Sequence, residues 1–348
     1  RLGIAHPGDS RQVSDYVLSK PSQPDRQLIR NAIDDSLRVL PDVLSGDLDK
    51  AEVEVNWVLE KVTDNPNAIA LNGAIYLKRG NNAAALNEAE RALVLNSGHI
   101  DSVSLQVAVY MAQQNFKAAE TKVNKALETK PNNLTLNLLK LQIHVVSKNN
   151  LAIELDYKDL IERFPQKLEF SYAFSGFLSS KNRDADALAL LQNVVDENAE
   201  ILKPKLVLVD YLLQKDKQQA KSTLMKFIEK NPSETGFYFR LANLFIQQKK
   251  FEEAKTPLKW IVSNNGRDKK GLAAKVLLAK LAVEGQDNTL ASSMVKEVLT
   301  VDSRHFGALL LKARIGLING LYEEAISDLR NLTRDFSDSD EAMVLLAQ

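Results

Sequence analysis

The sequence predicts an all-α solenoid built from helix-turn-helix repeats. The first observation is a pattern of small or apolar residues, spaced four and then three positions apart, that begins with Ala85, Ala89 and Ala92. This pattern recurs at steps of 34, 34, 34, 33, 34, 37 and 34 residues, and the later copies begin at Ala119, Ile153, Ala187, Ala220, Ala254, Ala291 and Ala325. A period of this length is typical of an array in which each helix pair buries its apolar face against its neighbours.

Composition supports the helical interpretation and excludes several functions. The chain has 348 residues, 45% of them hydrophobic, with 14 Gly and 10 Pro. Basic and acidic residues are equal at 45 each, which argues against general nucleic-acid binding because that binding depends on neutralising phosphates. Cysteine is absent, which excludes disulfides, thiolate catalysis and Cys-based metal sites. Without an apolar run of 18 residues, no membrane-spanning segment is expected.

The N-terminal part is expected to be irregular. Residues 1–31 are interpreted as the remnant of a preceding degenerate repeat. Residues 32–65 are interpreted as an irregular unit, because Ala51 and Val55 stand at the apolar positions of a second helix. Pro41 would interrupt the first helix of that unit, since proline removes a backbone hydrogen bond from a helix interior.

Eight regular units are predicted next. In each unit the first helix has a small residue followed by a larger one, and the second helix has the three-residue pattern. The larger residues of the first six units are Tyr76, Tyr110, His144, Leu178, Tyr211 and Phe245. The units are predicted at residues 66–99, 100–133, 134–167, 168–200, 201–234, 235–271, 272–305 and 306–339. Residues 340–348 are predicted to begin a further, truncated repeat.

One unit departs from the pattern. Pro257 falls inside a predicted second helix, where a proline is unfavourable. Residues 264–271 are expected to form a loop that holds the extra residues of the 37-residue step. Two outcomes are open: a hinge at which the array bends, or a rigid kink absorbed by local packing.

Several segments resemble the tetratricopeptide repeat family. Residues 237–245 followed by 251–254 are a near-complete match to its helix-pair motif, and residues 320–325 and 115–119 match the start of its second helix. The resemblance implies a right-handed superhelical solenoid. It also implies a concave groove, lined by the first helices, that holds a peptide or a partner protein.

The groove positions implied by this resemblance include apolar, polar and basic residues. Asn243, Lys280 and Arg314 occupy the same place in three successive units and form a polar and basic stripe. An apolar trough with a basic end predicts binding of an extended or helical peptide, with a carboxylate of that peptide at the basic end. In the alternative interpretation, the apolar residues are packing between repeats and the stripe has no role. The groove candidates are Met111, Gln142, Tyr172, Lys205, Phe239, Asn243, Lys280 and Arg314.

No motif for catalysis, metal binding or cofactor binding is present. The sequence lacks HExxH, GxGxxG, P-loop and GxSxG patterns, and its 4 histidines are far apart. His144 stands at a core position, which predicts a packed side chain. We therefore predict a non-enzymatic interaction scaffold or adaptor with no cofactor and no nucleic-acid partner. An alternative is the regulatory or substrate-docking arm of an enzyme whose catalytic domain lies outside this segment. Carbohydrate binding is a third possibility, although it would use stacked groove aromatics, and only Tyr172 and Phe239 qualify.

A narrower resemblance concerns the first residues. The motifs Leu2-Gly3-Ile4-Ala5 and Gly8-Asp9 are similar to motifs in long tetratricopeptide lipoproteins of bacterial envelopes that serve exopolysaccharide export and exosortase sorting. This resemblance implies a periplasmic or outer-membrane-tethered protein, held by a lipid outside this segment.

Overall fold

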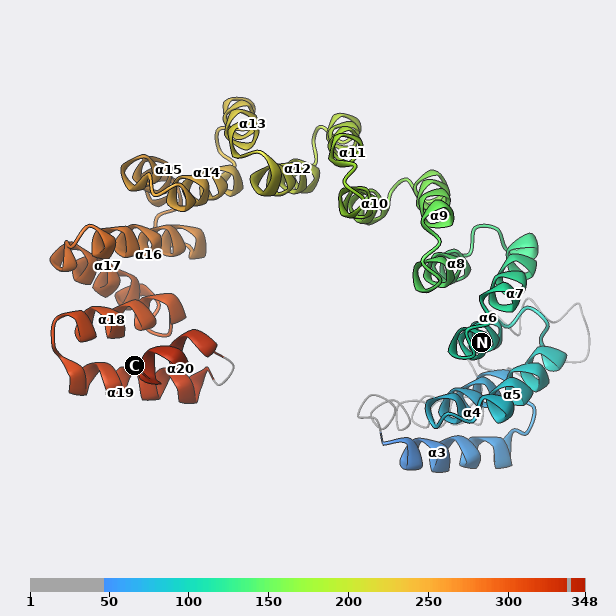
Figure 1. Cartoon of the computed structure of the whole chain (residues 1–348). Helices are drawn as coiled ribbons and strands as arrows, with labels where there is room; N and C mark the ends of the chain where they lie inside the picture. The colour runs from blue at the N-terminus through green and yellow to red at the C-terminus, as the bar shows by residue number, and fades with distance from the viewer. Residues whose placement is uncertain (1–46, 337–338, 348) are drawn as a thin grey trace, which may run out of the picture. The chain divides into compact units, whose positions relative to one another are not determined.

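The chain folds as helices joined by short turns. The computed structural model describes residues 47–336 and 339–347, which form 18 helices and no strand (Figure 1). The predicted all-α solenoid class is therefore confirmed. The predicted remnant at 1–31 lies outside the described residues, and the unit at 32–65 is described only from Asp47 onward.

First and second helices alternate along the array. The first helices are α4 (Pro66–Lys78), α6 (Ile100–Ala112), α8 (Leu134–Val146), α10 (Glu169–Ser180), α12 (Leu202–Lys215), α14 (Thr235–Gln247), α16 (Lys269–Glu284) and α18 (Phe306–Ile318). The second helices are α5 (Asn82–Leu95), α7 (Phe116–Thr129), α9 (Asn150–Arg163), α11 (Asp184–Glu197), α13 (Lys217–Lys230), α15 (Phe251–Asn265), α17 (Asn288–Val301) and α19 (Tyr322–Asp335). Helix α3 (Leu48–Lys61) precedes this series and α20 (Asp340–Ala347) follows it.

Each predicted range from 66 to 339 encloses one helix pair, except that α16 begins at Lys269, before the expected boundary at 272. The chain divides into two compact units, residues 1–170 and residues 171–348, which we call the first and second compact units.

The three-residue pattern forms the core, as its period predicts. In α15 all three members, Ala254, Leu258 and Ile261, are 0% exposed. Burying a side chain such as Leu258 stabilises the fold by about 1.5–3 kcal/mol. Steric contact explains why the first helix has a small residue. A Cβ on Gly73 of α4 would overlap the Leu105 side chain of α6, the first helix of the next unit. Small residues therefore let neighbouring helices approach closely.

The same backbone geometry closes the turn inside seven of the eight helix pairs of residues 66–335. After α4, the backbone N–H of Asn81 donates to the Tyr76 carbonyl (2.8 Å) and that of Gly80 donates to the Leu77 carbonyl (3.0 Å). This is the Schellman arrangement, which needs one residue in the left-handed region. Seven turns have that residue at φ between 57° and 78°, namely Gly80, Gln114, Lys148, Asn182, Lys249, Gln286 and Gly320.

The residue after the left-handed position often caps the second helix. Asn81 and Asn115 accept hydrogen bonds from the backbone N–H groups of Ala84 and Ala118, as short polar side chains do at an N-cap. Between α12 and α13 the turn contracts to Asp216, whose side chain accepts from the N–H groups of Gln218 and Gln219. This shorter turn accounts for the single 33-residue step.

The junction after Pro257 corrects one expectation. Helix α15 continues through the buried Pro257 to Asn265, and α16 begins at Lys269, so the prediction of a loop at 264–271 is wrong. The extra residues lengthen the helices, to 15 residues in α15 and 16 in α16. Gly266 turns the chain with φ 56°, and a Cβ on Gly271 would overlap the Gly266 carbonyl.

The position of the division between the units and the burial of Pro257 both bear on the hinge expected at this proline. The division between the units falls after Phe170, and residues 171–348, which include Pro257, form one compact unit. Pro257 is buried among the residues of that unit, so its ring contributes apolar surface to the core. Pro257 therefore does not lie at the division between the two compact units.

The Schellman turns predict opposite effects for two substitutions. Gly80→Ala should lower the free energy of unfolding by about 1–2 kcal/mol, because a Cβ is unfavourable in the left-handed region. Gln114→Gly should raise it by a smaller amount, because glycine also adds entropy to the unfolded chain. Urea unfolding followed by circular dichroism measures both. Gly98→Ala is the control, since Gly98 is outside the left-handed region, and an equal loss in that variant would contradict the explanation.

Candidate partner-binding surface

A pocket in the second compact unit combines apolar walls with charged groups. It has a volume of about 380 Å³ and lies among α14, α15, α16 and α18. We call it the α14–α18 pocket. Its lining residues are Ile246, Gln247, Lys249, Phe251, Leu277, Lys280, Leu281, Val283, Glu284, Leu311 and Arg314.

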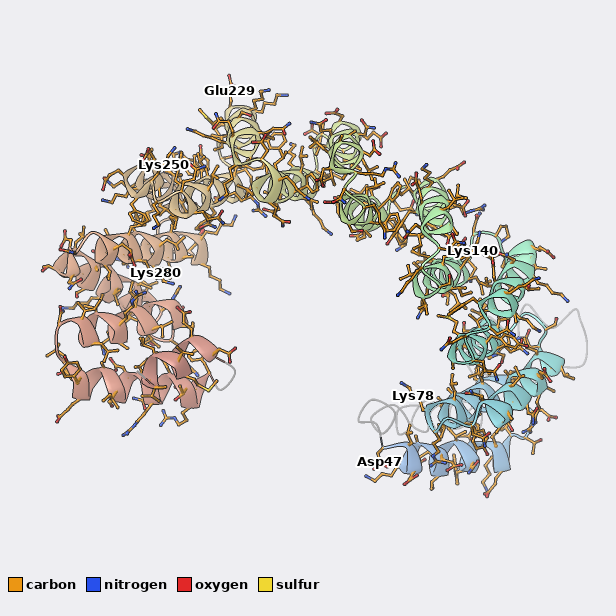
Figure 2. The ribbon with its side chains drawn as sticks, in the orientation of Figure 1. Asp47, Lys78, Lys140, Glu229, Lys250 and Lys280 are labelled. Atoms are coloured by element: carbon orange, nitrogen blue, oxygen red, sulfur yellow. The ribbon has the colours of Figure 1, made fainter. Side chains whose placement is uncertain are left out.

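Two residues of the predicted basic stripe meet in this pocket. Lys280 on α16 and Arg314 on α18 both line it, and Figure 2 labels Lys280 on the side of α16 that faces α18. Asn243 is exposed on α14 but does not line the pocket, whereas Ile246 and Gln247, one turn later on that helix, do. The structure therefore brings together the two cationic members of the stripe and leaves Asn243 beside them.

The pocket has more positive than negative charges. Lys249, Lys280 and Arg314 supply three cations, and Glu284 is the acidic residue of the lining. The Arg314 guanidinium lies 3.8 Å from the Glu284 carboxylate, and both side chains are about half exposed. A pair this exposed contributes little to stability. Arg314 therefore keeps donors available for a ligand anion.

The other groove candidates have mixed positions. Met111 is half-buried against the core of Val103 and Val107, and Phe239 is half-buried against the core that contains Tyr238. Tyr172 packs against the core around Leu191, with the Lys203 Nζ 5.7 Å from its ring centroid. Lys205 is half-buried and Gln142 is exposed.

Part of the apolar trough is packing between repeats. Positions equivalent to the groove candidates are buried at Ala70, Val209, Leu212, Val276 and Leu310. On α8, by contrast, Leu138 and Val145 are exposed on either side of Gln142. The pattern of one sequence cannot separate these cases, because groove and core positions are both apolar and both lie on the first helices.

Sequence reasoning missed several pocket residues. Lys249 lies in the turn after α14 and Phe251 begins α15, whereas the predicted groove used first-helix positions alone. The sequence feature that could have identified Phe251 is its position directly after the turn. From there it lines the pocket together with residues of α16 in the following unit.

A buried charged cluster surrounds His144 in the first compact unit. Its Nδ1 lies 2.5 Å from the Asp156 carboxylate of α9, and its Nε2 lies 3.3 Å from Glu120 of α7. Lys140 also approaches Asp156, at 3.4 Å. His144 and Asp156 are both about 95% buried, so the predicted packed histidine is found, with a buried carboxylate as partner. The cluster joins the three helices α7, α8 and α9.

The His144 cluster predicts a compensating pair of substitutions. His144→Phe should lower the free energy of unfolding by about 1–3 kcal/mol, because Asp156 stays buried with Lys140 as its remaining partner. His144→Phe combined with Asp156→Leu should recover most of that loss, because an apolar pair can replace a buried polar one. The equivalent of Asp156 in α11 is Leu190. Urea unfolding of the three variants tests this, and a double variant no more stable than His144→Phe would contradict it.

A second polar cluster lies at the start of α11. The Asp184 carboxylate accepts hydrogen bonds from Lys215 (2.8 Å), Ser179 (2.7 Å) and the Tyr211 hydroxyl (3.0 Å). These bonds, with that from Lys215 the strongest, lower the pKa of Asp184 from 3.8 to about 2. The cluster attaches the turn between α10 and α11 to α12.

The lowered pKa of Asp184 predicts a pH-dependent contribution to stability. A depressed folded-state pKa stabilises the fold above the unfolded pKa, and this stabilisation is lost as the pH falls from about 4 toward 2. The difference in unfolding midpoint between wild type and Asp184→Asn should therefore shrink across that interval. Urea titrations at pH 5.5, 3.5 and 2.5 measure it. A difference independent of pH, or an equal one for Asp196→Asn on the exposed face of α11, would refute this account.

Neither a cluster of metal-ligating residues nor a membrane-spanning helix is found in the described residues. No group of His, Asp or Glu residues within 47–336 and 339–347 could hold a metal ion. No helix in the same part of the chain is long and apolar enough to cross a membrane. His99 and His305, the loop histidines, are the N-cap residues of α6 and α18.

The fold and the family comparison agree. Stacked helix pairs define the class of helical repeat proteins. Residues 276–340 match the family model described as tetratricopeptide repeat. The other helix pairs of residues 66–336 have the same construction.

Similar solved structures include the tetratricopeptide repeat domain of P58(IPK), 13% identical, covering 91% of this chain and 96% of that one, with a TM-score of 0.29. A tetratricopeptide repeat protein from Parabacteroides merdae ATCC 43184 is 14% identical, with 81% and 97% coverage and a TM-score of 0.36.

A short part of the chain is similar to an enzyme. Over 56 residues it is 52% identical to the peptidyl-tRNA hydrolase of Legionella pneumophila (strain Corby) and 50% identical to that of Alcanivorax borkumensis. These matches cover 16% of this chain and span about 30% of the length of the curated relatives. Tetratricopeptide repeats are typically non-catalytic, and the hydrolase likeness leaves most of this chain unmatched.

Proposed function

We propose that this chain is a protein-interaction scaffold and that its second compact unit captures an acidic or carboxylate-bearing segment of a partner in the α14–α18 pocket. The tetratricopeptide fold supports a role in protein interaction. The observation that supports an acidic ligand is that Lys280 and Arg314 line the same pocket, which has more positive than negative charges. Guanidinium and ammonium groups form strong, charge-assisted hydrogen bonds with carboxylates.

The walls of the pocket define the rest of the ligand. Ile246, Leu277 and Val283 offer apolar surface beside the cations. A segment with an apolar side chain next to its carboxylate would bury the first against these residues and pair the second with Lys280 and Arg314. The contribution of the apolar contact would persist at high salt, whereas that of the exposed charges would be screened.

Charge reversal tests the proposal. The probes are a fluorescein-labelled peptide ending in Leu-Leu-Glu-Asp with a free carboxylate and the same peptide with an amidated C-terminus. The double variant Lys280→Glu/Arg314→Glu should weaken binding of the free-acid peptide by at least about tenfold, since each charge-assisted hydrogen bond is worth roughly 1.5–3 kcal/mol. The loss should be larger at 50 mM than at 300 mM NaCl. Fluorescence anisotropy measures both affinities.

The control variant is Lys217→Glu/Lys226→Glu, which reverses two exposed lysines on α13, away from the pocket. It changes the net charge of the chain equally. Equal loss of binding in the control would show a general electrostatic effect and contradict a site at Lys280 and Arg314. Unchanged binding in the pocket variant would also contradict it.

A second candidate function is a docking arm for an enzyme. The observation that favours it is the 56-residue similarity to peptidyl-tRNA hydrolases. Under the scaffold proposal the purified chain should release no peptide from peptidyl-tRNA and should not shift tRNA in a native gel. Turnover by the chain would overturn the non-enzymatic assignment, and a tRNA shift would favour the arm and contradict the expected absence of a nucleic-acid partner.

The envelope setting remains a prediction from the sequence. The motifs that carry it, at residues 2–5 and 8–9, lie outside the described residues. Fractionation of cells that express the natural gene would test a periplasmic or outer-membrane-tethered location in an exopolysaccharide or secretion assembly.

A further inference from the structure

A second hollow lies among α17, α18 and α19, and the proposed function does not use it. Its volume is about 460 Å³, and we call it the α17–α19 hollow. Val295, Leu299, Ile315 and Ala325 supply its apolar surface.

The hollow lies at a position where other units carry a large side chain. Tyr76, Tyr110, Tyr211 and Phe245 occupy the equivalent place in their first helices, and α18 has Gly316 there. A Cβ on Gly316 would lie 3.3 Å from the Ala325 Cβ, so a side chain at this position would point toward α19 and the hollow. The aromatic ring that four other units carry is therefore missing at this point of the fold.

The neighbouring unit shows how such a gap is otherwise filled. It has Ala282 at the same position, and the Met294 side chain packs against the core there. The residue of α19 equivalent to Met294 is Asp328, which pairs instead with Lys312 at 2.8 Å. The last helix pair thus lacks both the aromatic ring and the side chain that could replace it.

Leu321 lies at the rim of the hollow, at an N-cap position that holds Asn or Asp in five of the seven preceding helix pairs. It is the N-cap of α19, where the equivalent residues of other units include Asn81, Asn115 and Asp287. Leucine makes no capping hydrogen bond and is disfavoured at an N-cap. Leu321 is 51% exposed and lines the hollow. A residue that costs helix stability and adds exposed apolar surface is typical of a binding site.

Two charges on the rim are available to a ligand. Lys312 and Asp328 neutralise each other. Lys296 on α17 and Glu324 on α19 are exposed, and within the described residues neither has an ion-pair partner. The rim therefore offers one free cation and one free anion on opposite helices, with the apolar surface between them.

We propose that the α17–α19 hollow binds one aromatic side chain of a partner protein, in a segment where an acidic and a basic residue flank that aromatic residue. The ring would occupy the space left by Gly316 and contact Leu299, Ile315 and Leu321. The acidic neighbour would pair with Lys296 and the basic neighbour with Glu324. This site is independent of the α14–α18 pocket.

Short peptides test the proposal directly. The probes are acetyl-Asp-Tyr-Lys-amide and acetyl-Asp-Ala-Lys-amide, titrated into the ¹⁵N-labelled chain. The tyrosine peptide should shift the amide signals of residues 316, 321 and 325 and bind at least about tenfold more tightly than the alanine peptide. Gly316→Leu should abolish that preference by filling the space. Lys296→Glu, which leaves the apolar surface intact, should weaken the tyrosine peptide several-fold.

Two controls keep the test decisive. Circular dichroism and thermal unfolding establish that each variant is folded, and Lys296→Glu remains informative if Gly316→Leu is not. Lys217→Glu on α13 should leave both peptide affinities unchanged. Equal affinity for the two peptides, or shifts confined to residues outside 292–328, would overturn the proposal. The variants of this test leave Lys280 and Arg314 unchanged. A negative result here therefore does not bear on the proposal that the α14–α18 pocket binds a carboxylate.

Discussion

The whole array depends on close packing between consecutive helices. Each helix pair has an apolar stripe that it cannot bury alone, so every unit needs its neighbour. The small residues make this approach possible, as the contact between Gly73 and Leu105 shows. Seven of the eight helix pairs of residues 66–335 close with a turn that holds one left-handed residue. Since these positions are committed to packing, function is left to the residues between them.

The departures from the repeat separate into structural and functional kinds. His144 replaces an aromatic ring, and Asp156 compensates within the same unit by accepting its hydrogen bond. Pro257 and the longer step are absorbed by two longer helices and by Gly266 and Gly271. Gly316 and Leu321 have no such compensation in the described residues, and a hollow remains beside them. A departure that leaves space or exposed apolar surface is therefore the more informative one.

The fold could be predicted from the sequence because the same pattern of apolar residues occurs eight times. The burial of Ala254, Leu258 and Ile261 follows from spacing alone. The site could be predicted only in part. Lys280 and Arg314 share a register position and do meet, but Asn243 lies outside the pocket and Phe251 enters it from a second helix. Which apolar residue is groove and which is core depends on how far each helix is covered by its neighbour, and one sequence does not encode that separately.

The central claim is that the first-helix face of the second compact unit is where a partner binds. The most direct measurement is site-specific photo-crosslinking, with a photoreactive amino acid at Gln247, which lines the α14–α18 pocket, and at Met225, which is 56% exposed on α13. Incubated with the free-acid Leu-Leu-Glu-Asp peptide, the Gln247 variant should form the adduct, and excess unlabelled peptide should compete it away. Equal adducts at both positions, or an adduct at Met225 alone, would contradict this account.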